Sequence, residues 1–339
     1  MISLFWKIQN AVRHIIMVSF KFFDNLMRDV NFLYIISKKT PQSISEASNI
    51  PKQRMQEQPG LQHEMKPQPL VHQQPTEEGR LTEYLASGKL KGKVALITGG
   101  DSGIGRSTGV LFAKEKAQGV AIVYLPREER DAKEAKEIIE KQGDTKVLLI
   151  NKDVGYEKNA IEIVDEVVKK FERIDILVNN ASEQHVCEKI ENLEADQIER
   201  TFRSNIFGMF YLTKHCVKHM KEGSVIINLA SVTAYAGNPS LLDYSSTKGA
   251  IVSFTRSLSL QLANRYIRVN AVAPGPIWTP LIKASFSPET MEKFGSGVPM
   301  QRPGQPSEVA TCCVFLASKD SSYMTGQVLH PNGGKIVNG

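Results

Sequence analysis

Three residues in the second half of the chain have side chains suited to acid/base chemistry. Tyr244 and Lys248 are four positions apart in a segment with a helical pattern, so both side chains should lie on one helix face. A free tyrosine has a pKa of about 10, and a neighbouring cation favours its ionised form, so Lys248 would make Tyr244 a usable acid/base. Ser231 ends an apolar run thirteen residues earlier, and its hydroxyl is suited to bind a substrate oxygen as charge shifts to it. Singly, each residue has a plain structural explanation, as a surface pair or a turn serine.

A glycine-rich stretch supplies a second signal, for anion binding. Residues 98–105 read TGGDSGIG, after an apolar run and before a helical pattern. Gly99 permits a sharp turn, Gly103 lets backbone approach a pyrophosphate, and Gly105 lets the helix pack against the strand. The stretch lacks the Gly-Lys-Ser/Thr ending of an ATP-binding loop, which disfavours a kinase or ATPase. The residues predicted to hold a dinucleotide here are Gly99, Ser102, Gly103 and Ile104.

The form of the dinucleotide depends on the residues about 20 positions further on, where an acid would bind the ribose of NAD. Residues 124–127 read YLPR, without a carboxylate. Arg127 is suited to a 2′-phosphate, so NADP is the preferred prediction, with Tyr124 and Arg127 as contacts. Glu128 and Glu129 follow the arginine and would oppose a phosphate, so NAD stays open.

The apolar pattern from residue 92 onward predicts the scaffold for these residues. Short apolar runs alternate with amphipathic stretches, which is typical of parallel strands joined by helices. The predicted strands are 94–98, 120–125, 147–151, 174–179, 224–229 and 267–272, and the predicted helices are about 103–117, 127–142, 156–172, 194–221, 242–264 and 306–318. Continuous apolar runs suit strands covered on both faces. The predicted fold class is therefore α/β, a doubly wound parallel sheet (Rossmann fold) with helices on both faces and ligands beyond the carboxyl ends of its strands.

Composition divides the chain into three parts. Residues 1–40 are an apolar and basic N-terminal extension, residues 41–90 are rich in proline and glutamine, and residues 91–339 carry the alternating pattern. The middle part has few residues able to bury apolar area, so it is predicted to be an extended arm or linker that could lie along the enzyme surface. The whole is predicted to be a single domain with an N-terminal extension.

The first part of the chain carries its own prediction. Charged residues interrupt residues 1–40, so no apolar span is long enough to cross a bilayer. The first 23 residues lack acids, as organelle presequences do, but contain few serines and arginines. A cytoplasmic location is expected, and organelle targeting, a membrane-surface helix and an extension without a fixed role are left open.

Charge and cysteine content narrow the function classes. Residues 1–91 hold 12 Lys and Arg against 8 Asp and Glu, which is +4 of the formal net charge of +6, so the remainder is nearly neutral. No basic helix with interleaved aromatic residues occurs, so nucleic-acid binding is not predicted. The four cysteines show neither a CxxC pair nor metal-ligand spacing with histidines, so neither a metal nor a disulfide framework is predicted and a reducing compartment fits.

From residue 91 onward the chain resembles the short-chain dehydrogenase/reductase family. The resemblance rests on the glycine turn, on DV at residues 153–154, on NNA at residues 179–181, and on the Ser, Tyr and Lys described above. QPG at residues 58–60 and LDYS at residues 242–245 are similar to a subgroup of bacterial NADP-dependent aldehyde reductases and plant glucose/ribitol dehydrogenase homologues. The resemblance also implies a homotetramer, built partly through the helices at 194–221 and 242–264.

The resemblance implies further site residues. It implies that Asp153 and Val154 contact the adenine and that Asn180 and Ala181 line the coenzyme cleft. It implies that Asn205 is a fourth catalytic residue, holding a water in a proton relay to the lysine. The residues that it places beside the nicotinamide are Pro274, Gly275, Ile277 and Thr279. The residues from 281 to 298 should then form a mobile substrate lid.

These features predict an oxidoreductase that interconverts an alcohol and an aldehyde or ketone by hydride transfer. Tyr244 would donate the proton, Ser231 would polarise the oxygen, and Lys248 would lower the phenol pKa and hold the coenzyme ribose, so Tyr244 and Lys248 also count as coenzyme contacts. An NADPH-dependent aldehyde or carbonyl reductase is preferred. The alternatives are an NAD-dependent sugar or polyol dehydrogenase and a non-catalytic NAD(P)-binding sensor. Substrate identity and direction stay open.

Overall fold

A seven-stranded parallel sheet forms the centre of the protein in the computed structural model, which describes residues 41–337. The strand order is β5-β4-β3-β6-β7-β8-β9. The strands are β3 (Val94–Thr98), β4 (Gly119–Tyr124), β5 (Lys146–Asn151), β6 (Ile176–Asn179), β7 (Val225–Leu229), β8 (Arg268–Val272) and β9 (Val328–Leu329). The chain winds outward from β3 in one direction and then from β6 in the other, so a ligand crevice is expected where the carboxyl ends of these two strands meet.

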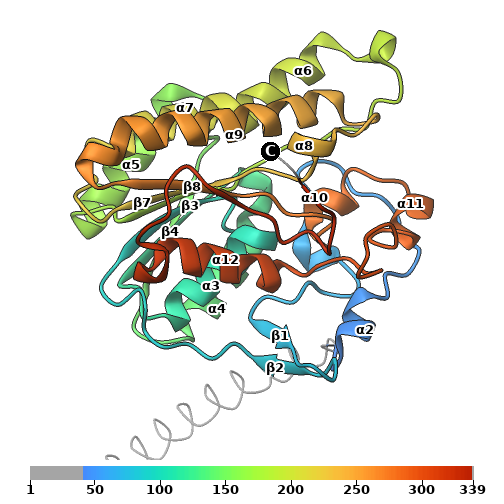
Figure 1. The fold of residues 1–339 in the computed structure, drawn as a ribbon, viewed down its shortest axis with the longest axis horizontal. Helices are drawn as coiled ribbons and strands as arrows, with labels where there is room; N and C mark the ends of the chain where they lie inside the picture. Colours follow the sequence, from blue (N-terminus) through green and yellow to red (C-terminus); the bar gives the residue numbers. More distant parts are fainter. Residues whose placement is uncertain (1–40, 338–339) are drawn as a thin grey trace, which may run out of the picture. The chain divides into compact units, whose positions relative to one another are not determined.

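Helices cover both faces of this sheet (Figure 1). One layer contains α3 (Gly103–Lys114), α4 (Glu129–Glu140) and α12 (Pro306–Ala317), and the other contains α5 (Glu157–Phe171), α6 (Ala195–Phe202), α7 (Gly208–Cys216) and α9 (Leu242–Leu262). In β3, Ala95 and Ile97 pack into the core on the α3 side, whereas Val94 and Leu96 pack into the core on the α5 side. The doubly wound α/β fold is confirmed.

The predicted elements agree with the observed ones to within a few residues, with three differences. The helix expected at 194–221 is α6, a π-helical segment η4 (Arg203–Phe207) and α7, which ends at Cys216. A π-turn inserts an extra residue into a helix, and this one holds Asn205. The strand β9 has only two residues, too short to leave an apolar pattern. A strand pair in the proline-rich part was also not expected.

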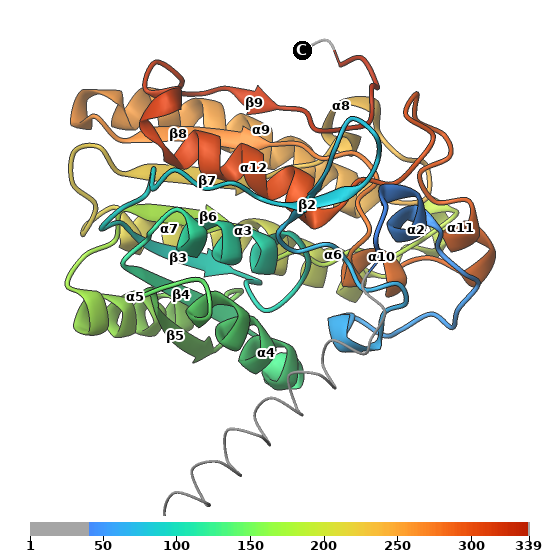
Figure 2. The same ribbon diagram turned by 90° about the horizontal axis from the view of Figure 1, so that it is seen from below.

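The proline-rich part, here called the arm (residues 43–90), lies along the domain rather than hanging from it (Figure 2). It contains α2 (Ile44–Ser48), η1 (Gln62–Glu64) and an antiparallel pair of β1 (Gln73–Pro75) and β2 (Leu81–Glu83). Side chains of the domain bind its backbone: Gln305 bonds to both Ala47 and Leu70, and Ser307 bonds to Gln73. Polar backbone groups of the arm thus find partners on the enzyme surface, and apolar side chains such as Ile50 and Met65 are buried as well.

Short helices surround the carboxyl edge of the sheet. They are α8 (Thr233–Ala236), α10 (Pro280–Lys283) and α11 (Pro288–Glu292), with the 3₁₀ turns η2 (Pro126–Glu128) and η3 (Ile190–Asn192). Two further 3₁₀ turns, η5 (Ala263–Arg265) and η6 (Lys319–Ser321), come before β8 and β9 and lie at the opposite edge of the sheet. Both α10 and α11 fall in the segment that is predicted to be a lid. No helix within residues 41–337 is long and apolar enough to span a membrane. The predictions for residues 1–40 fall outside the described range.

Candidate active site

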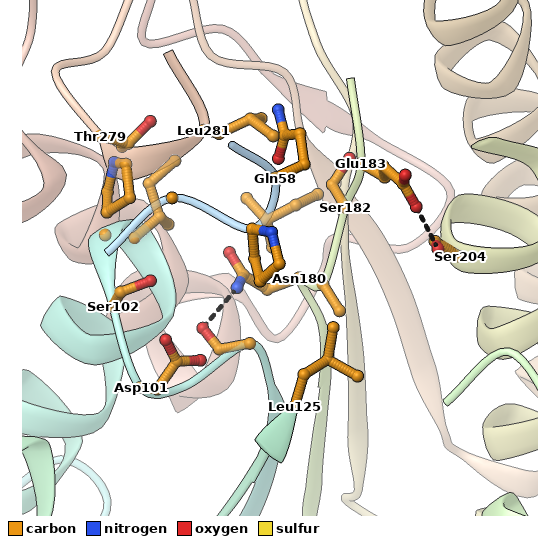
Figure 3. A pocket seen from close by; sticks show the side chains of 18 of the residues that line it. Gln58, Asp101, Ser102, Leu125, Asn180, Ser182, Glu183, Ser204, Thr279 and Leu281 are labelled. Carbon is orange, nitrogen blue, oxygen red and sulfur yellow. Dashed lines mark hydrogen bonds between the residues drawn. The ribbon is translucent and has the colours of Figure 1, made fainter. Parts of the chain in front are cut away.

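A cavity of about 260 Å³ opens at the carboxyl ends of the central strands. Figure 3 shows part of its wall, with Asp101 and Ser102 on the glycine turn and Gln58 near Leu281 and Glu183. Sixteen of the residues predicted for the site line it: Gly99, Ser102, Gly103, Ile104, Tyr124, Asp153, Val154, Asn180, Ala181, Ser231, Tyr244, Lys248, Pro274, Gly275, Ile277 and Thr279. Asn205 and Arg127 are the two predicted residues that do not.

The glycine turn has the backbone that the sequence pattern requires. Gly99 and Gly103 have φ angles of +60° and +51°, in the left-handed region that favours glycine. A Cβ on Gly105 would lie 2.0 Å from the carbonyl oxygen of Gly99, so the helix can approach the turn this closely only without a side chain. The start of α3 therefore faces the cavity, and its amides and dipole favour an anion.

The end of β6 is fastened to this turn. The side-chain amide of Asn180 donates to the carbonyl oxygens of Thr98 (2.8 Å) and Gly99 (3.0 Å), and Figure 3 shows the second of these bonds. The hydroxyl oxygen of Thr98 accepts hydrogen bonds from the amides of Asn180 and Ala181. These bonds hold two walls of the cavity in one arrangement.

Tyr244 and Lys248 lie side by side in the cavity wall. Both are buried, and Lys248 Nζ is 5.2 Å from the centre of the Tyr244 ring. Lys248 Nζ also donates to the carbonyl oxygen of Leu229 (2.9 Å), at the end of β7. One helix, α9, thus presents a phenol and an amine to the space that the glycine turn borders.

Burial changes the proton affinities of this pair in opposite directions. It raises the pKa of Tyr244 to about 12, although the hydroxyl of Ser231 acts to lower it. It lowers the pKa of Lys248 to about 7. Lys248 was predicted to lower the pKa of the Tyr244 phenol. In the folded protein, burial of the phenol has the larger effect and raises this pKa. A neutral phenol is the dominant form at pH 7.

Ser231 lies two residues beyond the end of β7, where it lines the cavity. Its Oγ accepts a hydrogen bond from the amide of Thr233 (3.2 Å) and lies 3.1 Å from the Thr233 hydroxyl. This arrangement fixes the serine hydroxyl at the same edge of the sheet as Tyr244. A carbonyl oxygen bound in the cavity could meet both hydroxyls.

Asn205 lies behind the cavity wall. It is buried, and its side chain bonds to the amide (2.7 Å) and the carbonyl oxygen (3.0 Å) of Glu183 and to Thr247 (3.0 Å). Its side chain therefore joins the π-helical segment to the loop after β6 and to α9. The water-relay role stays a prediction.

Arg127 is turned away from the cavity. Its guanidinium lies 3.5 Å from the carboxylate of Glu57 and 3.3 Å from the carbonyl oxygen of Gln58, both in the arm. The guanidinium therefore contacts the arm and is not among the groups that line the cavity. Sequence alone could not reveal this contact between residues about 70 positions apart.

Two buried carboxyls that sequence analysis did not assign to the site line the cavity. Asp101 is 1% exposed and lines the cavity, and Ser102 and Arg106 act to lower the pKa of its carboxyl against the effect of burial. Glu128 accepts a bond from the amide of Leu125 (2.8 Å). Burial raises the pKa of Asp101 to about 6, and burial together with the charge of Asp101 raises that of Glu128 to about 9. Asp101 belongs to the glycine motif, which was the only available signal.

The opposite end of the cavity is polar and also contains residues that were not predicted. The carboxylate of Glu183 accepts hydrogen bonds from Arg200 and from Ser204 (3.0 Å). The same carboxylate lies 2.6 Å from Nε2 of His185. Burial acts to raise the pKa of Glu183, but His185, Arg200 and Ser204 outweigh it and the pKa is lowered. A charged carboxylate therefore stands near the substrate end. Glu183 follows the NNA motif by two residues, so its position could have been inferred.

No group of three or more His, Cys, Asp or Glu side chains in the described range is arranged to hold a metal ion.

Comparison with known proteins gives consistent matches. A family model described as enoyl-(acyl carrier protein) reductase matches residues 99–335. The NADPH-dependent aldehyde reductase 1, chloroplastic, of Arabidopsis thaliana is 55% identical over 292 residues, covering 85% of this chain and 98% of that protein. The glucose and ribitol dehydrogenase of Daucus carota is 52% identical over 300 residues, covering 87% and 100%.

Solved structures match the same part of the chain. A 3-ketoacyl-(acyl-carrier-protein) reductase from Brucella melitensis complexed with NADH has a TM-score of 0.66 at 34% identity, covering 72% of this chain and 98% of that one. A short chain dehydrogenase from Burkholderia cenocepacia in complex with NADP has a TM-score of 0.68 at 29% identity, covering 73% and 98%.

Proposed function

Because the chain belongs to the short-chain dehydrogenase/reductase family, we propose that it reduces small aldehydes or ketones to alcohols with a nicotinamide coenzyme. Family membership makes it an NAD(P)-dependent oxidoreductase. The observation that carries the finer proposal is the position of Tyr244 and Lys248, buried side by side in the cavity that the glycine turn borders. This arrangement joins a proton donor to an anion-binding turn.

The residues present fit a dinucleotide coenzyme. The turn at Gly99, Gly103 and Gly105 leaves room that side chains would fill, and the start of α3 offers amides to a pyrophosphate. The family pattern assigns the remaining contacts to the cavity residues named above, from Asp153 to Thr279. When bound, the coenzyme supplies a hydride to the carbonyl carbon or accepts one from the alcohol carbon.

The chain's own residues handle the proton. In reduction, the neutral phenol of Tyr244 would donate its proton to the carbonyl oxygen as charge develops there. Ser231, oriented by Thr233, would hydrogen-bond to the same oxygen. Lys248, when protonated, would stabilise the phenolate that proton donation leaves behind. Asn205 would support the proton relay that the family pattern assigns to it.

Two sets of observations bear on the coenzyme's form. The name of the Arabidopsis relative supports NADP(H), the form preferred from sequence. Asp101 and Glu128 support NAD(H), because a carboxyl can accept a hydrogen bond from a ribose hydroxyl, and an ionised one repels a 2′-phosphate. Since Arg127 is bonded to the arm, we propose that both coenzymes bind and that NAD(H) binds more tightly.

A sugar or polyol dehydrogenase is the second candidate, and the polar end of the cavity favours it. Ser182, Glu183, Arg200 and Ser204 line this end and offer donors and acceptors to several hydroxyl groups at once. The carrot relative is named a glucose and ribitol dehydrogenase. The two candidates differ in substrate and direction but share the same proton and hydride chemistry.

The full chain assayed with both coenzymes tests these proposals. We expect NADH and NADPH to bind. In a panel of small aldehydes, ketones, sugars and polyols, we expect carbonyl substrates to oxidise NAD(P)H and alcohol substrates to reduce NAD(P). Turnover of aldehydes without polyols would select the first candidate, and the reverse would select the second. Coenzyme binding with no turnover of any panel member would support a non-catalytic sensor and overturn the proposed activity.

Assembly into a homotetramer is proposed from the apolar surface of the long helices. Phe210 on α7 is 49% exposed and Leu260 on α9 is 81% exposed, and the tilted rings of Phe210 and Phe254 have centres 4.4 Å apart. Exposed apolar side chains on neighbouring helices suit burial by a second copy. Sedimentation equilibrium of the full chain tests this, and a monomer at micromolar concentration would contradict it.

A cytoplasmic location is likewise a proposal. The name of the Arabidopsis relative, which includes the word chloroplastic, makes organelle import the alternative to test. Imaging of the full chain with a C-terminal fluorescent tag would decide, and signal confined to an organelle would overturn the cytoplasmic location.

A further inference from the structure

The arm forms part of the cavity wall. Gln58, Pro59 and Gly60 line the cavity next to the glycine turn and Leu281. We propose that residues 58–62 are a working part of the coenzyme site, and that Gln62 is a positioning residue that holds the phosphate-binding turn ready for the coenzyme. This inference rests on the proposed function only in taking the cavity as a coenzyme site.

Gln62 does for α3 what a capping residue normally does. The residue at the N-cap position, Ser102, makes no side-chain cap bond although serine is a favoured capping residue. Instead, the side-chain oxygen of Gln62 accepts a hydrogen bond from the amide of Gly103 (2.7 Å), and Gln62 is 2% exposed. A buried amide at a helix start needs an acceptor, so Gln62 satisfies it while Ser102 lines the cavity.

A buried ion pair holds Gln62 in place. The carboxylate of Asp131, fully buried at the start of α4, accepts hydrogen bonds from the backbone amides of Gln62 (2.8 Å) and His63 (3.0 Å). The same carboxylate pairs with Arg106 of α3 (3.3 Å). Arg106 Nε in turn donates to the carbonyl oxygen of Asp101 in the glycine turn (2.6 Å). The arm, α3, α4 and the turn are therefore joined through one side-chain cluster.

The other side of the arm contacts the predicted lid and the residues just before it. A Cβ on Gly60 would lie 2.2 Å from the carbonyl oxygen of Pro280, so the arm backbone meets α10 with no room for a side chain. Trp278 Nε1 donates to the carbonyl oxygen of Pro67 (2.9 Å), and Lys283 Nζ donates to that of Glu64 (2.7 Å). The residues of the apolar cluster shared by the two segments are Ile50, Met65, Trp278 and Met291.

The arm thus touches the coenzyme site from two directions. It caps the helix that receives the phosphates, and it supports the segment that closes over them. Loss of the cap leaves the turn with more conformations, and binding must then order it, which lowers coenzyme affinity without removing any catalytic group.

Gln62→Ala in the full chain tests the capping role, with Gln53→Ala as the matched control. Gln53 is also an arm glutamine, but its side chain bonds to the backbone of Pro51 and Lys66 within the arm. Titration of NADH and NADPH by nicotinamide fluorescence should show a dissociation constant raised about tenfold in Gln62→Ala and within about twofold of wild type in Gln53→Ala. The kcat at saturating coenzyme should stay within about threefold of wild type.

A second variant keeps the test decisive if Gln62→Ala does not fold. Gln62→Glu retains an acceptor for Gly103 and suits the helix start, yet it adds a negative charge beside the phosphates. We expect a folded protein that binds both coenzymes more weakly. Wild-type affinity in Gln62→Glu and, where it folds, in Gln62→Ala would overturn the proposal, as would a loss of kcat with unchanged affinity. Absence of coenzyme binding by wild type would overturn the proposed function as well.

Gly60→Ala tests the wall itself. The added methyl group must push the arm from Pro280, so coenzyme affinity should fall about tenfold. Gly249→Ala is the matched control, because a Cβ there meets no atom within 4 Å and Gly249 does not line the cavity. Equal affinity in these two variants would contradict a role of the arm in holding the coenzyme.

Discussion

Two pairs of buried ionisable groups stand in the same cavity and differ in kind. The proton pair is Tyr244 and Lys248 on α9, and the acid pair is Asp101 and Glu128 on the other side of the sheet's switch point. In the proton pair, one group is an acid and the other a base. In the acid pair, both groups would carry the same charge.

The difference shows how one cavity can separate two tasks. Burial favours the neutral form of all four groups, as their pKa values show. In the proton pair this leaves a phenol that can donate and an amine that titrates near pH 7, which suits proton transfer. In the acid pair, the charge of Asp101 adds to burial in raising the pKa of Glu128, which suits recognition of an uncharged hydroxyl. We therefore expect changes to the first pair to alter turnover and changes to the second to alter coenzyme choice.

The largest expected effect is on the proton pair. Tyr244→Phe removes the only atom of Tyr244 that can donate a proton, so kcat should fall about a thousandfold or more. Coenzyme affinity should stay within about twofold, since the ring remains. Steady-state kinetics and fluorescence titration measure the two quantities separately.

A second tyrosine provides the control for this change. Tyr235→Phe removes a hydroxyl that has no hydrogen-bond partner within the described residues and does not line the cavity. Its kcat should stay within about twofold of wild type. Near-normal turnover in Tyr244→Phe would remove the distinction between the two pairs.

The next effect concerns the pH dependence of stability, where Glu128 of the acid pair and Lys248 of the proton pair act with opposite sign. Glu128 has a folded pKa of about 9 against about 4.5 when unfolded, so between these values the folded state binds more protons and stability falls as pH rises. Lys248 has a folded pKa of about 7 against about 10.5 when unfolded, so stability rises with pH in that interval. From pH 6 to 7, the free energy of unfolding of wild type should fall by about 1 kcal/mol relative to Glu128→Gln.

Urea titrations at several pH values measure this slope. Between pH 7 and 9 the contributions of Glu128 and Lys248 should largely cancel, and Lys248→Met should restore a fall with pH. Parallel pH dependences in wild type and Glu128→Gln would mean that Glu128 is ionised in the folded protein. The acid pair would then be no different from a surface carboxylate pair.

The sequence predicted the proximity of Tyr244 and Lys248 and sixteen of the residues that line the cavity, for a physical reason. Helical spacing brings Tyr244 and Lys248 together locally, and the glycine turn needs conformations that only its own residues can supply. The six longer strands were predicted because most of them are buried on both faces, which leaves continuous apolar runs such as VALI in β3.

The parts that were not predicted depend on contacts between distant segments. Gln62 lies 41 positions before the amide that it binds, and Arg127 lies about 70 positions after the carboxylate that it faces. Gln62 is one of many glutamines in the arm, and Arg127 is followed by two glutamates. The sequence around each residue therefore gave no sign of its distant partner. Glu128 was noted as a charge that would oppose a phosphate, but its burial was not predicted, and it is 8% exposed. The burial of Glu128 results from the way η2 packs against the rest of the domain, and the sequence of η2 alone does not indicate this packing.

Changes to the acid pair should have an intermediate effect, on the ratio of NADPH affinity to NADH affinity. At pH 7.5 Asp101 is largely ionised, so Asp101→Asn should raise the affinity for NADPH relative to NADH about tenfold. Glu128→Gln should change this ratio less, because Glu128 is already neutral. As pH falls through 6, Asp101 takes up a proton and the wild-type ratio should move toward that of Asp101→Asn. An unchanged ratio in Asp101→Asn would show that the acid pair does not sense the 2′-position.

The smallest effect is expected for the substitution of Arg127. This variant tests whether Arg127 or the acid pair determines the preference for NADPH or NADH. Its guanidinium is bonded to Glu57 and Gln58, so Arg127→Ala should leave NADPH and NADH affinities within about twofold of wild type. Arg130→Ala is the control, since Arg130 is exposed and paired with Glu134. If Arg127→Ala instead weakened NADPH about tenfold and spared NADH, the arginine would have to leave the arm when the phosphate binds. The prediction from sequence would then be right, and the arm would compete with the coenzyme for the same cation.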